Sequence, residues 1–598
     1  MCGIVGVIDH RKRVSREVLN AMRDCLAHRG PDDQGSYINS RCSVGLGHRR
    51  LSILDLSPSG HQPMSTPDGR LTIVFNGEIY NYLELRDELR AQGQRFTTGT
   101  DTEVLLRGYE AWGVKALDRL AGMFAFAIWD DRDESLLLAR DRVGKKPLVY
   151  FQDGNTLAFA SELKALLLFP SCRAQLDPAG VEAYLAFGYI PAPLTVFKNI
   201  RKLEPGHYLR VLRDRAEVVR YWFPERANQP AARSRGERIE QLRALFRESV
   251  KIRLRSDVPL AIFLSGGIDS AAVAAECCAQ GQKLRALTST FDHDHTDLPY
   301  GTKVAQHLGL EQEVIHTNGD GIGDDIYRIV WHYDEPFADS SNIPSYYISQ
   351  AVKGRFKVVL NGDGGDEAFG GYPRYEHVAV RQFVKGLATM IGARDGRGRG
   401  PWQRYFQSRS TFVRSKRTAL LGGWAPRNCA VTRLIAENPF LSAYRPSDAI
   451  HMALGGDRHI YLAHDLLFKM DIALMAHHTE GRSPFLDHRL LEWAQNLPAD
   501  DLVVGREKKV LLREALRGRL PSEVLARAKH GFAAPMVPWL QGPLRPLCDE
   551  HLPTHLLERE PQESALAAFR RTQGREGADQ VWALLMFAIW ANQWRANW

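Results

Sequence analysis

Cys2 follows the initiating methionine, so removal of Met1 would leave a cysteine whose thiol and free α-amine belong to the same residue. An α-amine has a pKa of about 7.7–8.0, so part of it is unprotonated near neutral pH and can take the thiol proton. The pair therefore predicts a nucleophile that carries its own general base. Taken alone, the cysteine also fits a small apolar residue in a first strand.

Five further positions suit chemistry on a carboxamide that belongs to a free amino acid. Asn76 and the backbone N–H of Gly77 can donate to a tetrahedral oxyanion, because glycine lets its backbone approach closely. An amino acid also carries a carboxylate and an ammonium on one carbon, which require a guanidinium and acidic acceptors. Arg50, Glu78 and Asp101 provide those groups. We expect the first two residues to be catalytic and the other three to bind the amino acid.

Five short motifs follow Cys2 in order. They are His28-Arg29-Gly30-Pro31-Asp32, His48-Arg49-Arg50-Leu51-Ser52-Ile53, Asn76-Gly77-Glu78-Ile79-Tyr80-Asn81, Gly99-Thr100-Asp101 and Gly122-Met123-Phe124-Ala125-Phe126. Together with the terminal cysteine they resemble the class II glutamine amidotransferase domain, an N-terminal-nucleophile (Ntn) hydrolase, over the first third of the chain. The resemblance implies an αββα sandwich in which Cys2 attacks the carboxamide of glutamine, forms a γ-glutamyl thioester and releases ammonia.

A second group of residues is suited to hold phosphates. The apolar run Leu260–Leu264 leads into Ser265-Gly266-Gly267-Ile268-Asp269-Ser270 and then into an alanine-rich helix. A strand, a glycine turn and a helix N-terminus present backbone N–H groups and the positive end of a helix dipole to one anion. No Gly-Lys-Ser/Thr closes the loop, so it does not follow the Walker pattern. It resembles the PP-loop of enzymes that split ATP into AMP and pyrophosphate.

Carboxylates follow a second predicted strand. Lys357–Leu360 opens into Asn361-Gly362-Asp363-Gly364-Gly365-Asp366-Glu367, where acidic side chains on a glycine-rich loop can bind Mg²⁺ that bridges ATP phosphates. Further strands are predicted at Leu284–Phe291 and Glu313–His316, with a helix around Lys303–Leu308 between them. This alternation indicates an α/β fold with a doubly wound parallel sheet and the nucleotide at the carboxyl ends of its strands.

With these motifs the resemblance extends over nearly the whole chain. The PP-loop, Asp334–Ser341, the Gly-Asp-Gly-Gly-Asp-Glu segment, Glu480–Asp487 and Lys508-Lys509 are similar to glutamine-hydrolysing asparagine synthetases. That family's chemistry implies a β-carboxylate activated as its AMP ester and then attacked by channelled ammonia.

The same resemblance implies roles for individual residues. The ATP site would be formed by Phe263, Ser265, Gly266, Gly267, Asp269, Ser270, Ser289, Asn361 and Gly362. Asp269 and Asp366 would hold Mg²⁺ and pyrophosphate. Asp363 would support adenylate formation, and Lys509 would neutralise charge in the transition state.

Three places depart from the best-studied bacterial pattern of this family. Asn361 stands where a serine is common, Asp363 replaces a longer glutamate, and Gly481-Arg482-Ser483 replaces an Arg-Val type stretch. These positions are expected near the acceptor, so they leave the ATP chemistry intact and the acceptor open. L-Aspartate is the first hypothesis, and another carboxylate, of a surface polysaccharide or a natural product, is the second. A catalytically silent homologue is disfavoured because Cys2 and the PP-loop are intact, and Cys2 also disfavours a ring-closing enzyme.

Length and composition predict a soluble protein with two or more domains. The chain has 598 residues, of which 44% are hydrophobic and 25% charged. We predict a glutaminase domain over 1–212, a linker over 213–238 and an ATP-binding domain over 239–598. The boundary is suggested by Pro224–Gly236, which is rich in Pro, Ala, Arg and Gln without an apolar period, and by the amphipathic segment Ile239–Leu254 that follows.

The remaining features concern location and partners. The eight cysteines form no CxxC pair, and the chain has neither a signal peptide nor about 18 consecutive apolar residues, which predicts a cytoplasmic protein with reduced thiols and no membrane contact. The net charge of +8 and the Gly/Arg-rich run Asp395–Gly400 are not accompanied by interleaved aromatics or a zinc-finger spacing, so nucleic acid is not expected. The expected partners are glutamine, ATP and aspartate, and a homodimer is left open.

Overall fold

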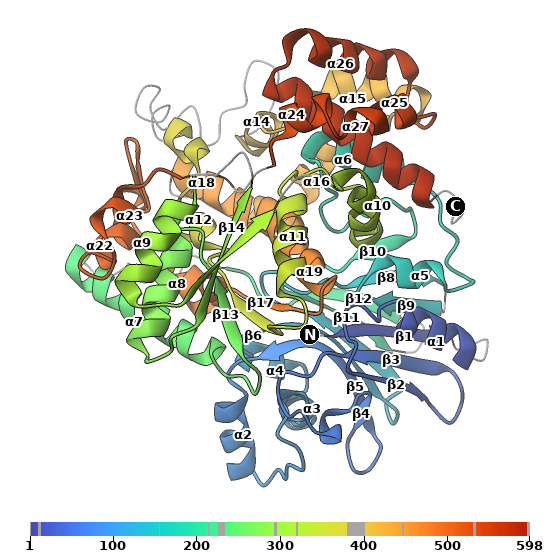
Figure 1. Ribbon diagram of the computed structural model, residues 1–598. Helices are drawn as coiled ribbons and strands as arrows, with labels where there is room; N and C mark the ends of the chain where they lie inside the picture. The colour runs from blue at the N-terminus through green and yellow to red at the C-terminus, as the bar shows by residue number, and fades with distance from the viewer. Residues whose placement is uncertain are drawn as a thin grey trace.

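The computed structural model describes residues 2–9, 14–154, 156–212, 215–224, 234–291, 296–317, 321–378, 401–444, 446, 448–529, 531 and 534–594. Figure 1 shows an N-terminal half built on two sheets, in blue to teal, and a C-terminal half built on a third sheet, in green to red. The N-terminus lies at the centre of the molecule, where the two halves meet (Figure 1).

The N-terminal half contains two six-stranded antiparallel sheets, ordered β10-β8-β9-β1-β3-β2 and β12-β11-β7-β6-β5-β4. The strands of the first sheet are β1 Gly3–Asp9, β2 Asp33–Ile38, β3 Val44–Arg50, β8 Val149–Asp153, β9 Thr156–Ala160 and β10 Ile200–Lys202. Those of the second are β4 Met64–Ser65, β5 Leu71–Ile79, β6 Gly122–Asp130, β7 Ser135–Arg140, β11 His207–Leu212 and β12 Arg215–Arg220.

The two sheets pack face to face between layers of helices. Ile4 and Leu46 of the first sheet join Val74 and Leu138 of the second in one buried cluster, so alternate residues of each strand form the inner layer. The helices of this half are α1 Arg16–Asp24, α2 Tyr82–Ala91, α3 Asp101–Trp112, α4 Ala116–Arg119, α5 Leu163–Leu167 and α6 Pro178–Phe187. α1 and α5 cover the first sheet, while α2 and α3 cover the second. The predicted αββα sandwich is confirmed.

The C-terminal half is organised by a five-stranded parallel sheet in the order β15-β14-β13-β16-β17. Its strands are β13 Leu260–Phe263, β14 Arg285–Phe291, β15 Gln312–Thr317, β16 Val358–Leu360 and β17 Glu480–Arg482. The first four match the predicted strands to within a residue or so at their ends. β17 was not predicted as a strand, because three residues with a charge at each end carry no apolar pattern.

Helices cover both faces of this sheet, which confirms the doubly wound prediction. α8 (Ile268–Ala279) and α9 (Leu298–Leu308) pack on one face with α7 (Arg235–Arg253) beside them, and α11 (Asn342–Val352) and α19 (Leu467–Met475) pack on the other (Figure 1). Because β13 has β14 on one side and β16 on the other, the chain winds outward in both directions from β13. The carboxyl ends of β13 and β16 are therefore neighbours.

The C-terminal half contains further helices around this sheet. They are α7 Arg235–Arg253, α10 Ile322–Tyr333, α12 Gly365–Phe369, α14 Pro401–Gln407, α15 Arg414–Leu421, α16 Ala430–Glu437, α17 Pro439–Ala443, α18 Ala449–Gly456, α20 His488–Ala494, α21 Ala499–Leu502, α22 Val510–Ala515, α23 Ser522–Ala526, α24 Met536–Gln541, α25 Arg545–His551, α26 Arg559–Thr572 and α27 Arg575–Trp594. Asp457–Leu466, between α18 and α19, is a π-helix.

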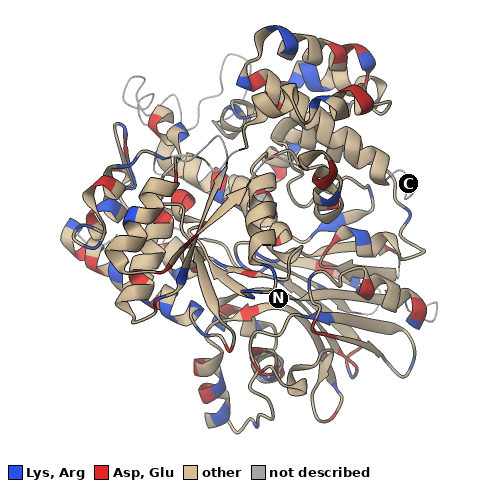
Figure 2. Cartoon of the chain, in the orientation of Figure 1, with Lys and Arg blue, Asp and Glu red and all other residues tan. Residues whose placement is uncertain are grey.

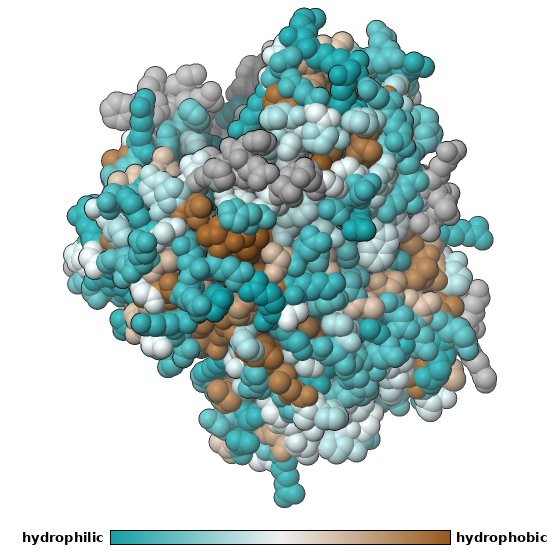
Figure 3. Space-filling model, viewed as in Figure 1, coloured by the Kyte–Doolittle hydropathy of each residue, from teal (hydrophilic) through white to brown (hydrophobic). Residues whose placement is uncertain are grey.

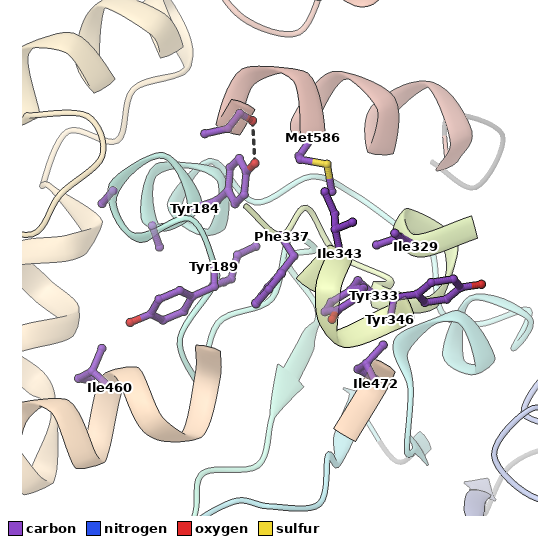
Figure 4. Close-up of a cluster of buried hydrophobic side chains, with 14 of the residues drawn as sticks. Tyr184, Tyr189, Ile329, Tyr333, Phe337, Ile343, Tyr346, Ile460, Ile472 and Met586 are labelled. Carbon is purple, nitrogen blue, oxygen red and sulfur yellow. Dashed lines mark hydrogen bonds between the residues drawn. The ribbon is translucent and has the colours of Figure 1, made fainter. Parts of the chain in front are cut away.

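A shared hydrophobic core joins the two halves. Figure 4 shows one hydrophobic cluster that contains Tyr184 of α6 together with residues from α10, α11, α19 and α27 of the C-terminal half. The hydroxyl of Tyr184 donates to the carbonyl oxygen of Ala583 over 2.7 Å, so even this buried polar atom is bonded across the interface. The relative position of the halves is thus fixed by packing.

The segment predicted as a linker, 213–238, contains regular structure at both of its ends. β11 pairs antiparallel with β12, so the second sheet continues into the predicted linker 213–238. β12 is an edge strand with mostly exposed, polar side chains, which is why it shows no apolar alternation. Residues 225–233 of the linker and the run Asp395–Gly400 lie outside the described residues.

The helix predicted over Ile239–Leu254 begins earlier. α7 starts at Arg235, directly after its N-cap residue Ser234. The Ser234 side chain accepts a hydrogen bond from the Glu237 backbone N–H, and the Glu237 side chain accepts one from the Ser234 backbone N–H, which is a capping box. The Ser-x-x-Glu spacing marks this helix start, which the apolar period alone does not show. The helix end agrees with the prediction to one residue.

The surface is mixed in charge and mostly polar. Figure 2 shows Lys and Arg interspersed with Asp and Glu over the outer helices, and on the face in Figure 3 hydrophilic side chains predominate. Among the described residues, every helix is too short or too polar to cross a bilayer.

Candidate active sites

Cys2 lies in a small cavity where the two halves meet. It immediately precedes β1 and is buried, which raises the pKa of its thiol and makes a nearby base necessary for ionisation. The predicted residues Arg50, Gly77, Glu78 and Asp101 line the same cavity. The C-terminal half completes the wall with Glu480.

Asn76 places a free donor beside Cys2. The side-chain oxygen of Asn76 accepts a hydrogen bond from the backbone nitrogen of Cys2 over 3.1 Å. The fully buried Nδ2 of Asn76 has no hydrogen-bond partner in the part of the chain that the structure describes. An unpaired buried donor is costly, so its presence next to a nucleophile indicates a group that is satisfied by a ligand.

Gly77 is required for a reason other than the one predicted. A Cβ on Gly77 would collide with the carbonyl oxygen of Met123 on the neighbouring strand β6. The glycine therefore allows close pairing of β5 with β6. Its backbone still lies beside Cys2, but approach to a substrate is not what excludes a side chain here.

The three remaining residues put a cation and two acids around the cavity. The guanidinium of Arg50 donates to the carbonyl oxygens of Ser57 over 3.0 Å and Leu54 over 3.3 Å, which fixes its orientation. Asp101 is the first residue of α3 and accepts a bond from the Ile79 backbone over 2.9 Å. Burial raises the pKa of Asp101 to about 6 and that of Glu78 well above its ordinary value.

A larger cavity of about 410 Å³ opens at the carboxyl ends of β13 and β16. It is lined by almost all of the residues predicted for the nucleotide and for the second reaction: Phe263, Ser265, Gly267, Asp269, Ser270, Ser289, Asn361, Gly362, Asp363, Asp366 and Lys509. Gly266 is not among the lining residues; it has a φ of +69°, and a Cβ there would collide with Tyr300 and Gly301 of α9. Only glycine suits this turn, and an ATP contact through the Gly266 backbone stays a prediction.

The PP-loop is folded by its own hydroxyl groups. Ser265 Oγ accepts from the Gly267 backbone over 3.3 Å, and Ser270 Oγ donates to the Gly267 carbonyl over 3.2 Å. α8 begins at Ile268, so its N-terminal N–H groups face the cavity. Across the cavity, the buried Ser289 Oγ lacks a hydrogen-bond partner among the described residues, which leaves it available to a ligand.

Lys509 joins the two strand ends. Its ammonium lies 2.5 Å from Asp269 and 2.6 Å from Asp366, and Lys529 lies 2.6 Å from the other oxygen of Asp366. Burial alone would raise the pKa of Asp366, but the two ammonium groups lower it below its ordinary value. Burial raises the pKa of Asp269 despite Lys509. The backbone of Lys509 has a φ of +53°, a strained conformation for a non-glycine residue.

Glycines make this close approach feasible. A Cβ on Gly371 would collide with Asp366 Oδ1 and Lys509 Cε, and a Cβ on Gly365 would collide with Asp269 Oδ1. The two carboxylates thus converge on one point, which an ammonium fills here. Within the described ranges no group of three or more acidic, His or Cys side chains could hold a metal ion. Two carboxylates fit Mg²⁺ only if phosphate oxygens and water complete its coordination, as is usual for nucleotide-bound Mg²⁺.

Several cavity residues were missed from the sequence. Arg513, Arg527 and Lys529 all line the cavity and add positive charge around the PP-loop. The Arg527 guanidinium donates to the Ser265 carbonyl over 3.1 Å. These residues belong to segments without a recognised motif. Their position near the expected phosphate site is therefore visible only in the folded chain.

Comparisons with known proteins bear on both cavities. A family model described as glutamine amidotransferase domain matches residues 1–222, and one described as asparagine synthase matches residues 241–592. Asparagine synthetase (glutamine-hydrolyzing) 1 of Bacillus subtilis is 32% identical over 99% of this chain and 96% of its own length. The chain belongs to the glutamine-hydrolysing asparagine synthetase family. It is therefore a glutamine-hydrolysing ligase, and its family uses ATP.

Other members of the asparagine synthetase family match over similar lengths. Asparagine synthetase (glutamine-hydrolyzing) 3 of Bacillus subtilis is 32% identical and covers 89% of this chain and 87% of its own. Amidase chry2 of Gibberella zeae is 30% identical and covers 91% and 90%. Each of these two relatives therefore matches both halves of this chain within one protein.

In this member of the synthetase family, a buried charge network links Cys2 to the C-terminal half. Arg29 is fully buried, and its Nε donates to the Cys2 carbonyl oxygen over 3.0 Å. Its other nitrogens lie 2.7 Å from Glu162 and 2.7 Å from Asp471 of α19, where Lys146 also pairs at 2.9 Å. Breaking such a network would leave charges buried without partners, so the Cys2 strand is firmly tied to the synthetase half.

Proposed function

We propose that this enzyme transfers the amide nitrogen of glutamine to the β-carboxylate of L-aspartate, forming L-asparagine, glutamate, AMP and pyrophosphate. The proposal rests on the presence of two sites in one chain. In the first, Cys2 lies beside the unpaired Asn76 amide. In the second, Lys509 lies between Asp269 and Asp366 in a cavity of about 410 Å³. The first suits amide hydrolysis and the second suits ATP cleavage at the α-phosphate.

In the first half-reaction Cys2 acts as the nucleophile. Once Met1 is removed, the α-amine takes the thiol proton and the sulfur attacks the carboxamide carbon of glutamine. Asn76 Nδ2 and the Gly77 N–H would stabilise the oxyanion while Arg50, Glu78 and Asp101 hold the amino acid by its charged groups. The C–N bond breaks, the amine returns a proton to the leaving ammonia, and water hydrolyses the thioester to glutamate.

In the second half-reaction an acceptor carboxylate oxygen attacks the α-phosphorus of ATP, and pyrophosphate leaves. The PP-loop and the N-terminus of α8 suit the pyrophosphate, and Lys509 suits the negative charge that develops during adenylation. Asp269 and Asp366 would hold Mg²⁺, which when bound neutralises phosphate charge. Asp363 would support formation of the adenylate at the acceptor end.

Ammonia from the first site would then attack the acyl carbon of the adenylate. The bond to the AMP oxygen breaks, the nitrogen loses a proton and the amide forms. The domain boundaries, a homodimer and a cytoplasmic location stay predictions.

A different acceptor carboxylate is the alternative, and a specific observation favours keeping it. The departures at Asn361, Asp363 and Ser483 lie together: Asn361 and Asp363 line the ATP cavity, and Ser483 Oγ bonds Asn361 over 2.6 Å behind them. A relative carrying the printed name amidase chry2 matches nearly the full chain. Differences in this cluster would change which acceptor is used, while the PP-loop, Asp269, Asp366 and Lys509 stay in place for ATP.

An acceptor screen tests the proposal. Purified enzyme is given Mg-ATP, glutamine and one carboxylate at a time, including aspartate, glutamate, uronic acids and short peptides, and AMP and pyrophosphate are measured. Aspartate should give the highest acceptor-dependent AMP release. Release with another carboxylate and none with aspartate would contradict aspartate as the acceptor while supporting the shared chemistry.

A further inference from the structure

A lysine from the N-terminal half lies against the wall of the ATP cavity of the C-terminal half, next to Asp363, which lines that cavity. Lys145 lies in the loop between β7 and β8, and only 3% of its side chain is exposed. Its ammonium lies 3.2 Å from Ser483 Oγ and 3.6 Å from the Asp363 carboxylate. An amine on the glutaminase side is thus a direct neighbour of the acceptor end of the other site.

The residues that depart from the family pattern form one hydrogen-bonded network with this lysine. Ser483 Oγ accepts from Lys145 and donates to Asn361 Oδ1 over 2.6 Å, and Asn361 Nδ2 donates to Asp363 Oδ2 over 2.7 Å. Each polar group therefore has a compatible partner. A Cβ on Gly481 would collide with Leu474 Cδ1 of α19 at 2.6 Å, so the glycine allows α19 to pack closely beside this network.

The loop that carries Lys145 is held rigidly. The fully buried Asp141 accepts from the backbone of Val143 over 3.1 Å and of Lys145 over 3.0 Å with one oxygen. Its other oxygen accepts from the backbone of Lys146 over 2.9 Å and of Phe124 over 3.2 Å. The ammonium is consequently delivered by a preorganised turn rather than by a mobile side chain on a free loop.

We infer that Lys145 is a positioning residue for the second half-reaction, supplied by the glutaminase half, which holds Asp363 in its working orientation through Ser483 and Asn361. The inference rests on the proposed role of Asp363. The cavity also contains Asp366 and Glu367 and must admit the charges of ATP, so an unheld Asp363 carboxylate would be repelled. A nearby ammonium and a fixed amide donor oppose that repulsion and set the direction of the carboxylate.

This arrangement has a consequence for synthesis from free ammonium. That reaction does not use the Cys2 thiol, yet it needs Asp363 in place. Lys145 should therefore affect ammonium-dependent synthesis even though it belongs to the half that hydrolyses glutamine.

The test compares Lys145→Met with Lys146→Met in the full-length chain. Both lysines are buried at the interface, but Lys146 pairs with Asp471 at 2.9 Å rather than with Asp363. Lys145→Met should lower kcat for ammonium-dependent amide and AMP formation about 100-fold with little change in the KM for ATP, since misplacement of a reacting group costs rate more than binding. Glutamine hydrolysis should be retained, and Lys145→Arg should recover part of the rate.

Two further variants, Ser483→Ala and Asp363→Asn, test the same network. Ser483→Ala cuts the same network without removing a charge, so it should lower the same kcat even if Lys145→Met folds poorly. Equal losses in the two Lys→Met variants, or normal kcat in Lys145→Met and Ser483→Ala, would overturn the inference. A normal adenylation rate in Asp363→Asn would instead contradict the proposed role of Asp363 itself.

Discussion

The guanidinium of Arg482 lies 3.2 Å from the carboxylate of Glu78. Arg482 ends β17 in the parallel sheet, whereas Glu78 lies on β5 in the glutamine cavity. Arg482 also donates to Glu480 over 2.6 Å, and Glu480 lines the cavity that contains Cys2. The next residue, Ser483, bonds Asn361 in the ATP cavity. One strand end therefore contributes to both sites.

Arg482→Met should weaken both the fold and glutamine binding. It leaves two carboxylates buried without their cation, a change that costs about 3–5 kcal/mol in comparable buried pairs. We expect a lower midpoint of thermal unfolding and a higher KM for glutamine. The control is Arg489→Met, because Arg489 also pairs with a carboxylate, at 2.8 Å, but its side chain is 40% exposed. Equal shifts in the two variants would contradict the structural role given to Arg482.

Cys2→Ala should separate the two half-reactions. Glutamine hydrolysis should fall by at least about 1000-fold, as expected when a nucleophile is removed. Synthesis from ammonium should continue, because the ATP cavity does not use this thiol. Activities are measured with glutamine and with ammonium as nitrogen donors, and mass spectrometry of active enzyme should show Met1 removed. Residual glutaminase activity at the normal rate would disprove the nucleophile assignment.

Glutamine binding should weaken in acid because of Asp101. Burial raises the pKa of this carboxyl from its ordinary 3.8 to about 6, so the group is ionised above about pH 6 and protonated below it. The protonated form cannot pair with the ammonium of glutamine, so the KM for glutamine should rise as pH falls through that value. The effect on stability has the opposite direction, because burying the ionised carboxylate lowers the free energy of unfolding. This loss is absent below the unfolded pKa of 3.8, develops as pH rises, and is complete above the folded pKa of about 6.

Asp101→Asn is the control for this pH effect. The amide has a similar shape but no titrating proton, so the KM should be high and nearly constant between about pH 5 and pH 7. The measurement is the KM for glutamine against pH in both proteins. An unchanged acid dependence in the variant would assign the titration to another group, such as Glu78.

Lys509→Ala should suppress the second half-reaction only. Removing one preorganised charge contact lowers kcat by about 100- to 1000-fold in comparable enzymes. AMP and amide formation should fall by that amount, whereas glutamine hydrolysis should continue. Lys303→Ala is the matched control, because Lys303 is half-exposed and pairs with Glu523 away from the cavity. Normal acceptor-dependent AMP release in Lys509→Ala would show that the lysine only pairs with Asp269 and Asp366.

The sequence was most informative where chemistry depends on local pattern. The PP-loop and the Asp363–Asp366 segment each follow a strand directly, so parallel-strand topology was enough to bring them to one cavity. Lys145 and Lys529 were not predicted, because their contacts join segments far apart in the chain. Gly77 shows the opposite limit, because its motif marks the residue, but the contact with the Met123 carbonyl oxygen that forbids a side chain is visible only in the folded chain.

Isotope transfer tests the central claim most directly. The enzyme is incubated with Mg-ATP, glutamine labelled with ¹⁵N in the amide and aspartate labelled with ¹⁸O in the β-carboxylate. The account predicts ¹⁵N in the side-chain amide of asparagine, one ¹⁸O in the phosphate of AMP, and AMP and pyrophosphate in equal amounts. Formation of ADP as the main nucleotide product, or AMP without ¹⁸O while ¹⁵N-asparagine accumulates, would contradict adenylation of the acceptor.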